Sequence, residues 1–185
     1  MSTLRADAQR NHDRVLVAAA EAFAEYGPDI SADEIARRAG VGHGTVYRRF
    51  PSKDALIAAV VSARLGELSD GAEALLEETD AGTAFERFVW DVAELFSVDR
   101  GLCEGIPRCG EMAEVAAAKE RLHGVVEQLV TRAQAEGSLR PDIQPDDVPI
   151  LISSAIMGAA GSADRESWRR YVAVVLDGLR PTRVL

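Results

Sequence analysis

Residues 31–50 of this chain, SADEIARRAGVGHGTVYRRF, decide the fold. Ser31 followed three residues later by Glu34 is typical of a capping box, in which the hydroxyl accepts from the third helical amide and the carboxylate reaches back. Gly40 is expected to end this helix, and a second, short helix is predicted to follow it and to stop at Pro51. Two helices joined by a short glycine-containing turn form a helix-turn-helix, whose second helix enters the major groove of DNA.

The short helix, about residues 43–50, concentrates hydrogen-bond donors. Its donor side chains are Thr45, Tyr47, Arg48 and Arg49. Val46 and Phe50 can pack inward, and Lys53 follows at the start of the next helix, where free amides and the helix dipole favour a phosphate. Donors to phosphate fix the position of a protein on DNA, while side chains that point into the groove contact base edges.

Apolar residues recur at helical spacing through nearly all of the chain, and no alternating run flanked by turns indicates a strand. The predicted fold class is therefore all-α, with an N-terminal three-helix helix-turn-helix DNA-binding domain followed by a helical effector-binding and dimerisation domain. Further helices are predicted from Ser52, over about Ala84–Ser97, over Glu111–Glu136, over Asp146–Gly158 and over Glu166–Leu179, with an irregular connection or short helical turns over Asp99–Gly110. The predicted domains are 1–53, with the N-terminal arm, and 54–185.

Residues 22–56, AFAEYGPDISADEIARRAGVGHGTVYRRFPSKDAL, closely resemble the DNA-binding domain of TetR-family transcriptional regulators. The resemblance covers about residues 10–60, and its core, G-T-x-Y-x-x-F-x-x-K-x-x-L, is highly specific. The stretch GSLRPDIQPDDVPIL and the closing LDGLRP resemble, more weakly, the dimer-forming region of such regulators. The resemblance implies a homodimeric, usually repressing protein whose C-terminal domain binds a small effector.

Position by position, the resemblance assigns phosphate contacts to Thr45, Tyr47, Arg49 and Lys53, and base contacts to His43, Gly44 and Arg48. Arg48 is the best candidate for a bidentate contact to guanine O6 and N7. Gly42 departs from the family pattern, which often has a capping serine there, so that one phosphate contact is not expected. Arg5 and Arg10 lie in a polar N-terminal arm that either touches DNA or is a disordered tail.

The overall charge of −9 and the pI near 4.9 are unlike the basic footprint of most DNA-binding domains. The charge is unevenly distributed, because residues 1–53 hold 8 basic and 7 acidic residues, whereas residues 54–185 hold 13 and 23. Residues 43–53 contain three basic residues and no acid. An acidic body around a small basic surface predicts weak, strongly salt-dependent non-specific binding to DNA.

The C-terminal part suggests an effector pocket and a dimer interface. The predicted effector-binding residues are Phe88, Trp90, Cys103, Met112 and Met157, although plain core packing of the phenylalanines is the simpler interpretation. The predicted interface is a four-helix bundle formed with a second copy through Ser154, Gly158, Trp168, Val172, Val175, Leu176 and Leu179. The alternative is that this stripe packs only within its own subunit.

Other functional classes have little support in the sequence. No nucleophile elbow, phosphate loop, zinc motif or dinucleotide motif is present, so neither an enzyme, a cofactor nor a metal site is predicted. The absence of a signal-peptide pattern and of a long apolar run predicts a soluble, cytoplasmic protein that does not bind membranes. The expected partners are double-stranded operator DNA, a second copy of the chain and a small effector. Two other hypotheses remain: a module whose short basic helix binds an acidic protein, and a helical enzyme with a C-terminal cavity.

Overall fold

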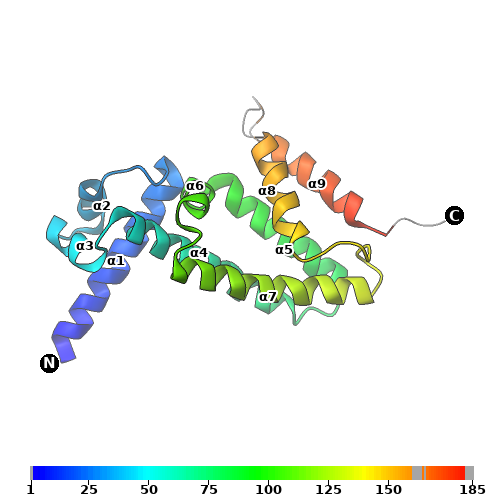
Figure 1. Cartoon of the computed structure of the whole chain (residues 1–185), viewed down its shortest axis with the longest axis horizontal. Helices are drawn as coiled ribbons and strands as arrows, with labels where there is room; N and C mark the ends of the chain where they lie inside the picture. Colours follow the sequence, from blue (N-terminus) through cyan, green and yellow to red (C-terminus); the bar gives the residue numbers. More distant parts are fainter. Residues whose placement is uncertain (1, 160–163, 165, 182–185) are drawn as a thin grey trace. The chain divides into compact units, whose positions relative to one another are not determined.

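The computed structural model describes residues 2–159, 164 and 166–181, with side chains from Arg10 onward except that of Arg100 (Figure 1). Every regular element in these ranges is an α-helix, which confirms the predicted fold class. No helix in the described ranges combines the length and the apolarity needed to cross a membrane. The helices are α1 (Ser2–Tyr26), α2 (Ala32–Ala39), α3 (His43–Arg49), α4 (Lys53–Leu75), α5 (Ala81–Val98), α6 (Arg100–Cys109), α7 (Ala113–Ala135), α8 (Asp147–Ala159) and α9 (Ser167–Leu179).

The chain forms two compact units. Unit 1 comprises Met1–Leu65 and Val98–Ala118, and unit 2 comprises Gly66–Ser97 and Lys119–Leu185. Neither unit is one continuous stretch, because α6 and its neighbours pack with the N-terminal helices although they follow α5 in the chain. The predicted domains, 1–53 and 54–185, were divided by expected function and not by packing, and that division remains a prediction.

Unit 1 contains the helix-turn-helix and packs it on α1 and on the first part of α4. Its core includes Phe23, Ile35, Leu56 and Ile57, each no more than 2% exposed. Ser52 begins α4 as predicted, because its hydroxyl accepts the amide hydrogen of Ala55 at 3.0 Å. Both α2 and α6 pack against α1, so the position of the helix-turn-helix depends on contacts with distant parts of the sequence.

Of the two alternatives predicted over residues 99–110, the irregular connection was wrong and the short helical turns were too short, since α6 is a ten-residue helix. The buried carboxylate of Asp99 caps it, accepting the amide hydrogen of Leu102 at 2.9 Å. Gly101 packs against Phe23, and Gly105 packs against Val61 so tightly that a Cβ on either glycine would lie within 2.7 Å of its neighbour. Close packing therefore outweighs the low helix propensity of glycine here.

Unit 2 has its own apolar core, built from α5, α7, α8, α9 and the last turns of α4. Phe85, Phe88 and Val89 of α5 are at most 4% exposed within it. The indole rings of Trp90 and Trp168 lie 6.3 Å apart, centroid to centroid, at an angle of 59°. α8 and α9 pack side by side as a helical pair (Figure 1).

Candidate nucleic-acid interface

The turn between α2 and α3 has the geometry that the sequence predicts. The hydroxyl of Ser31 accepts the amide hydrogen of Glu34 at 3.2 Å and so begins α2. Gly40 ends it with a φ of +62°, a backbone conformation that glycine adopts without strain. The amide of Val41 donates to the Ala36 carbonyl at 3.0 Å, and α3 then begins after Gly42, which offers no side-chain cap. These contacts make α2 and α3 a helix-turn-helix.

The carboxylate of Glu34 differs from the predicted capping box. It accepts hydrogen bonds from Arg37 Nε at 2.8 Å and from Arg38 Nε at 2.9 Å. These hydrogen bonds, first that of Arg37 and then that of Arg38, lower the pKa of Glu34 to about 2. Two of the basic residues of unit 1 are thus paired within α2.

One side of α3 is anchored in the core of unit 1. Val46 and Phe50 are 2% and 5% exposed, as predicted for the inward face. The Phe50 ring also stacks on the His12 imidazole of α1, with centroids 5.2 Å apart. This anchoring fixes which residues of α3 face outward.

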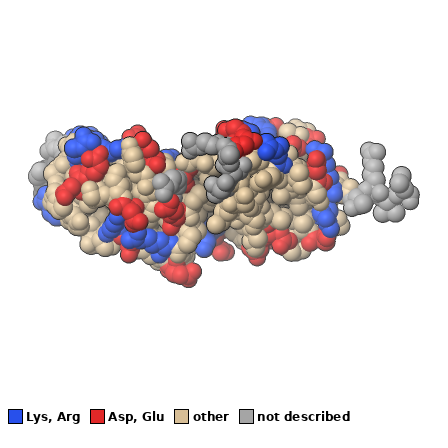
Figure 2. Space-filling model, turned by 90° about the horizontal axis from the view of Figure 1, so that it is seen from above, with Lys and Arg blue, Asp and Glu red and all other residues tan. Residues whose placement is uncertain are grey.

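The predicted DNA-binding residues lie on and beside the outward face. His43, Gly44, Tyr47, Arg48 and Arg49 are exposed, and Thr45 and Lys53 are half-buried. A Cβ added at Gly44 would meet nothing within 4 Å, so the surface above this glycine is open. Figure 2 shows acidic and basic residues interspersed over the visible face.

Several of these side chains have protein partners. Arg48 Nε donates to the Gly44 carbonyl at 3.0 Å, and Arg49 Nε donates to His12 Nδ1 at 3.1 Å. Lys53 Nζ lies 3.8 Å from Asp29 Oδ1. On an exposed surface such contacts contribute little, so phosphate groups can compete for these cations.

Three contacts at this surface were missed by sequence reasoning. Arg108 of α6 binds Asp54 at 2.7 Å and Asp29 at 3.2 Å, and hydrogen bonding, above all to Asp54, raises its pKa. His43 Nδ1 is hydrogen-bonded to Asp33 of α2. The contacts of Arg108 could not be predicted because its partners are far away in the sequence. The only sequence feature of Asp33 is its position in the first turn of α2, which does not predict a contact with His43.

The predicted effector-binding residues are not gathered within one unit. Cys103 and Met112 belong to unit 1, whereas Phe88, Trp90 and Met157 belong to unit 2. Within unit 2, Phe88 is a core residue at 3% exposure and Met157 is 76% exposed, so Met157 does not line a cavity inside this unit. Unit 2 does have an open groove of about 480 Å³, lined in part by Phe85, Leu139 and Leu179, but by none of the five predicted residues. The described residues form no group of three or more His, Cys, Asp or Glu suited to a metal ion.

The predicted dimer stripe divides into two sets. Trp168, Val172, Leu176 and Leu179 are 1–7% exposed and Val175 is half-buried, so the core of their own unit already covers them. The apolar stripe of α9 therefore packs within its own subunit, which was the alternative interpretation. Sequence periodicity alone does not distinguish a side that faces the core from a side that faces a second copy. Ser154 and Gly158, in contrast, are exposed on α8.

A different apolar surface lies outward on the α8–α9 pair. Its large exposed side chains are Ile150 and Met157 of α8, at 62% and 76% exposure, and Tyr171 and Val174 of α9, at 42% and 69%. Positions 150, 154, 157 and 158 recur at helical spacing, as do 171 and 174, so each set lies on one side of its helix. We call these six residues the outer face of α8 and α9.

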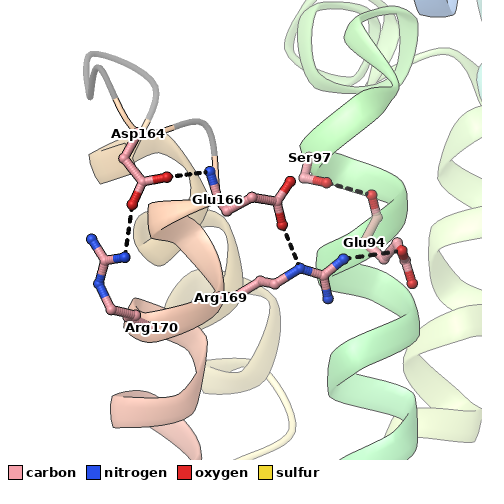
Figure 3. Close-up of polar contacts among 6 residues, drawn as sticks. All are labelled: Glu94, Ser97, Asp164, Glu166, Arg169 and Arg170. Carbon is pink, nitrogen blue, oxygen red and sulfur yellow. Dashed lines mark hydrogen bonds and ion pairs between the residues drawn. The ribbon is translucent and has the colours of Figure 1, made fainter.

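Ion pairs surround the start of α9 and connect it to α5. Arg169 of α9 binds Glu166 at 2.6 Å and Glu94 of α5 at 3.3 Å, as Figure 3 shows. Its guanidinium also lies 4.5 Å from the centroid of the Trp168 ring. Asp164 accepts from Arg170 at 2.7 Å and from the amide of Glu166 at 3.0 Å.

Comparison with known proteins agrees with the geometry. A family model described as "Bacterial regulatory proteins, tetR family" matches residues 15–60, and one described as "Transcriptional regulator SbtR-like, C-terminal domain" matches residues 80–181. An uncharacterized HTH-type transcriptional regulator of Mycobacterium tuberculosis is 37% identical over 86 residues, which span 42% of this chain but only 44% of that protein.

Two further relatives align over nearly their whole length. The HTH-type transcriptional regulator UidR of Escherichia coli is 28% identical over 192 residues, covering 97% of this chain and 94% of UidR. The crystal structure of a TetR transcription regulatory protein from Mycobacterium vanbaalenii is 38% identical, with a TM-score of 0.69, and the match covers 96% of this chain and 99% of that one.

Proposed function

Because the chain belongs to the TetR family of transcriptional regulators, we propose that it binds a specific DNA operator through α3 and represses transcription until a small effector releases it. The observation that supports this is the orientation of α3. Val46 and Phe50 bury one side of the helix, and Tyr47, Arg48 and His43 are exposed on the remainder of its surface. Hydroxyl and guanidinium donors on an exposed short helix suit the phosphates and base edges of the major groove. Acting on chromosomal DNA would place the protein in the bacterial cytoplasm.

We further propose that the active form is a homodimer joined through the outer face of α8 and α9. Four large apolar side chains exposed on two adjacent helices are costly in water, and the small exposed residues Ser154 and Gly158 on α8 permit close helix approach. Two-fold pairing of this surface would form a four-helix bundle. Static light scattering at micromolar concentration tests it, and a monomeric mass would contradict it.

A dimer constrains the operator. Two recognition helices must be about 34–36 Å apart, or a multiple of that, to enter successive major grooves on one side of the duplex. The operator is therefore expected to be a pseudo-palindrome. Selection of bound sequences from random DNA measures the motif, its symmetry and the half-site spacing together.

Release requires an effector that prefers the form of the dimer in which this spacing is wrong. To change DNA occupancy from nearly complete to nearly absent, it must prefer that form by roughly 10⁴-fold, or about 5.5 kcal/mol. A largely apolar molecule in a preformed pocket can supply such a preference. A screen of small apolar compounds for loss of operator binding in a gel-shift assay tests this step, and no active compound at millimolar concentration would contradict it.

Two variants separate DNA binding from binding of an acidic protein by the same helix. Tyr47→Ala should weaken binding to all DNA sequences, because it removes a phosphate donor. Arg48→Ala should relax sequence preference by about 1–3 kcal/mol at one base pair. If random-sequence selection enriches no motif with the wild-type protein at low salt, the proposal is wrong and the protein-binding hypothesis gains support.

A further inference from the structure

His43, the first residue of α3, contacts two neighbouring side chains. Its Nδ1 is hydrogen-bonded to Oδ1 of Asp33, which lies in the first turn of α2. Its ring centroid lies 4.6 Å from that of Tyr47, with the ring planes at 41°. The His43 side chain is 55% exposed, so the ring is held by protein contacts and still accessible from outside.

The contact with Asp33 determines where the proton of the neutral imidazole sits. An ionised carboxylate offers only acceptor atoms, so Nδ1 of His43 must carry the hydrogen of this bond. A neutral imidazole carries one hydrogen on its two nitrogens. The other nitrogen, Nε2, is therefore left with a lone pair and can only accept a hydrogen bond. Carboxylates fix the tautomer of metal-binding histidines in the same way.

We propose that Asp33 sets the base preference of His43 by fixing this tautomer, so that the ring accepts a hydrogen bond from DNA instead of donating one. The inference rests on the proposed function, in which the N-terminal residues of α3 contact base edges. In the major groove, cytosine N4 and adenine N6 are donors, whereas guanine N7 and O6 and thymine O4 are acceptors. His43 is therefore expected to favour cytosine or adenine at the base that it contacts.

The tautomer can be measured without DNA. The chain has three histidines, so ¹⁵N spectra of the imidazole nitrogens in the full-length protein are assignable by comparison with His43→Ala. At pH 8 the His43 ring should show a protonated Nδ1 and an unprotonated Nε2. In Asp33→Ala both tautomers should be populated. A wild-type ring with its hydrogen on Nε2, or with hydrogens on both nitrogens, would overturn the inference whatever the protein does to DNA.

Selection from random DNA then tests the consequence for recognition at the same pH. His43→Ala identifies the operator position that the ring contacts, as the position whose preference disappears. At that position the wild-type protein should favour cytosine or adenine over guanine by about tenfold, the low end of the cost of a mismatched pair. Asp33→Ala should reduce this preference to within about twofold at the same position and leave the other positions unchanged.

Removing an acid near DNA also raises affinity for every sequence, so a matched control is needed. Glu25→Ala removes one carboxylate from α1, where Glu25 lies 3.8 Å from Arg38 and has no contact with His43. This variant should leave the motif unchanged. Circular dichroism tests whether each variant is folded. If Asp33→Ala does not fold, the ¹⁵N spectrum of the wild-type protein still tests the tautomer.

The outcomes separate this inference from the function on which it rests. If the wild-type protein enriches no motif, both are wrong. If it enriches a motif that neither His43→Ala nor Asp33→Ala alters, the protein binds specific DNA and the inference alone is wrong. The same holds if the two variants alter different positions, or if the preferred base is guanine or thymine.

Discussion

Replacing Gly105 by alanine should destabilise the protein through one close contact between α6 and α4. An added Cβ would lie 2.7 Å from Val61 Cγ2 and 3.2 Å from Ile57 Cγ2, whereas carbon atoms normally approach to about 3.5–4.0 Å. Val61 and Ile57 are 1% and 0% exposed, so neither side chain can move into solvent. Overpacking of this kind costs about 1–3 kcal/mol, which is offset by about 1 kcal/mol of improved helix propensity.

Gly124→Ala provides the matched control, because it makes the same chemical change in the middle of α7. A Cβ at Gly124 would meet nothing within 4 Å, so only the gain of about 1 kcal/mol in helix propensity is expected. The difference in unfolding free energy between the two variants therefore isolates the packing cost, about 1–3 kcal/mol. Near 185 residues this corresponds to a difference in Tm of roughly 2–12 °C.

Thermal unfolding followed by circular dichroism at one fixed protein concentration measures this difference. The concentration is held constant because association of subunits would itself change Tm. Gly124→Ala is expected to have the highest Tm, the wild type an intermediate Tm and Gly105→Ala the lowest. If the two variants were equally stabilised, α6 would not be packed against α4 as described, and the reasoning would be refuted.

Three further predictions concern the interface, the acid stability and the capping of α6. Val174→Asp should convert the dimer to a monomer in light scattering, since it places a charge in the outer face of α8 and α9; an unchanged dimer mass would count against that interface. The lowered pKa of Glu34 means that its ion pairs stabilise the fold above pH 4.5 and that this contribution is lost as the pH falls towards 2. Glu34→Gln should therefore flatten the dependence of Tm on pH in that range, and parallel profiles would contradict this. Asp99→Ala should cost roughly 2–4 kcal/mol in chemical denaturation, because it removes both the cap of α6 and the ion pair with Arg64, whereas Asp99→Asn, which keeps an acceptor for the cap, should cost less.

The helix-turn-helix could be predicted from the sequence because its determinants are local. Ser31 caps α2 through the amide three residues on, and Gly40 provides the left-handed residue that ends it. The inward positions of α3, Val46 and Phe50, follow from the helical period alone. Each of these features depends on residues within one or two turns of one another.

The features that sequence reasoning missed depend on contacts between distant segments. The helix α6 forms despite two glycines because α1 and α4 approach it closely at Gly101 and Gly105. In α9, both sides are apolar, so the helical period does not say whether Val172 or Val174 faces the core of its own unit. The pairing of His43 with Asp33 depends on the angle between two helices, which no local pattern encodes.

The tryptophan pair in unit 2 gives the protein an intrinsic fluorescence signal that needs no added label. Trp90 and Trp168 are the only tryptophans of the chain, and both lie in unit 2, while every residue assigned to DNA binding lies in unit 1. The two indole rings lie 6.3 Å apart, and the guanidinium of Arg169 lies 4.5 Å from the Trp168 ring, so a rearrangement of unit 2 is expected to change their emission. A change of tryptophan fluorescence on addition of operator DNA would thus report on unit 2, although the residues proposed to contact DNA belong to unit 1. Titrating that change with and without an effector would give the coupling free energy between the two ligands from a single unlabelled sample.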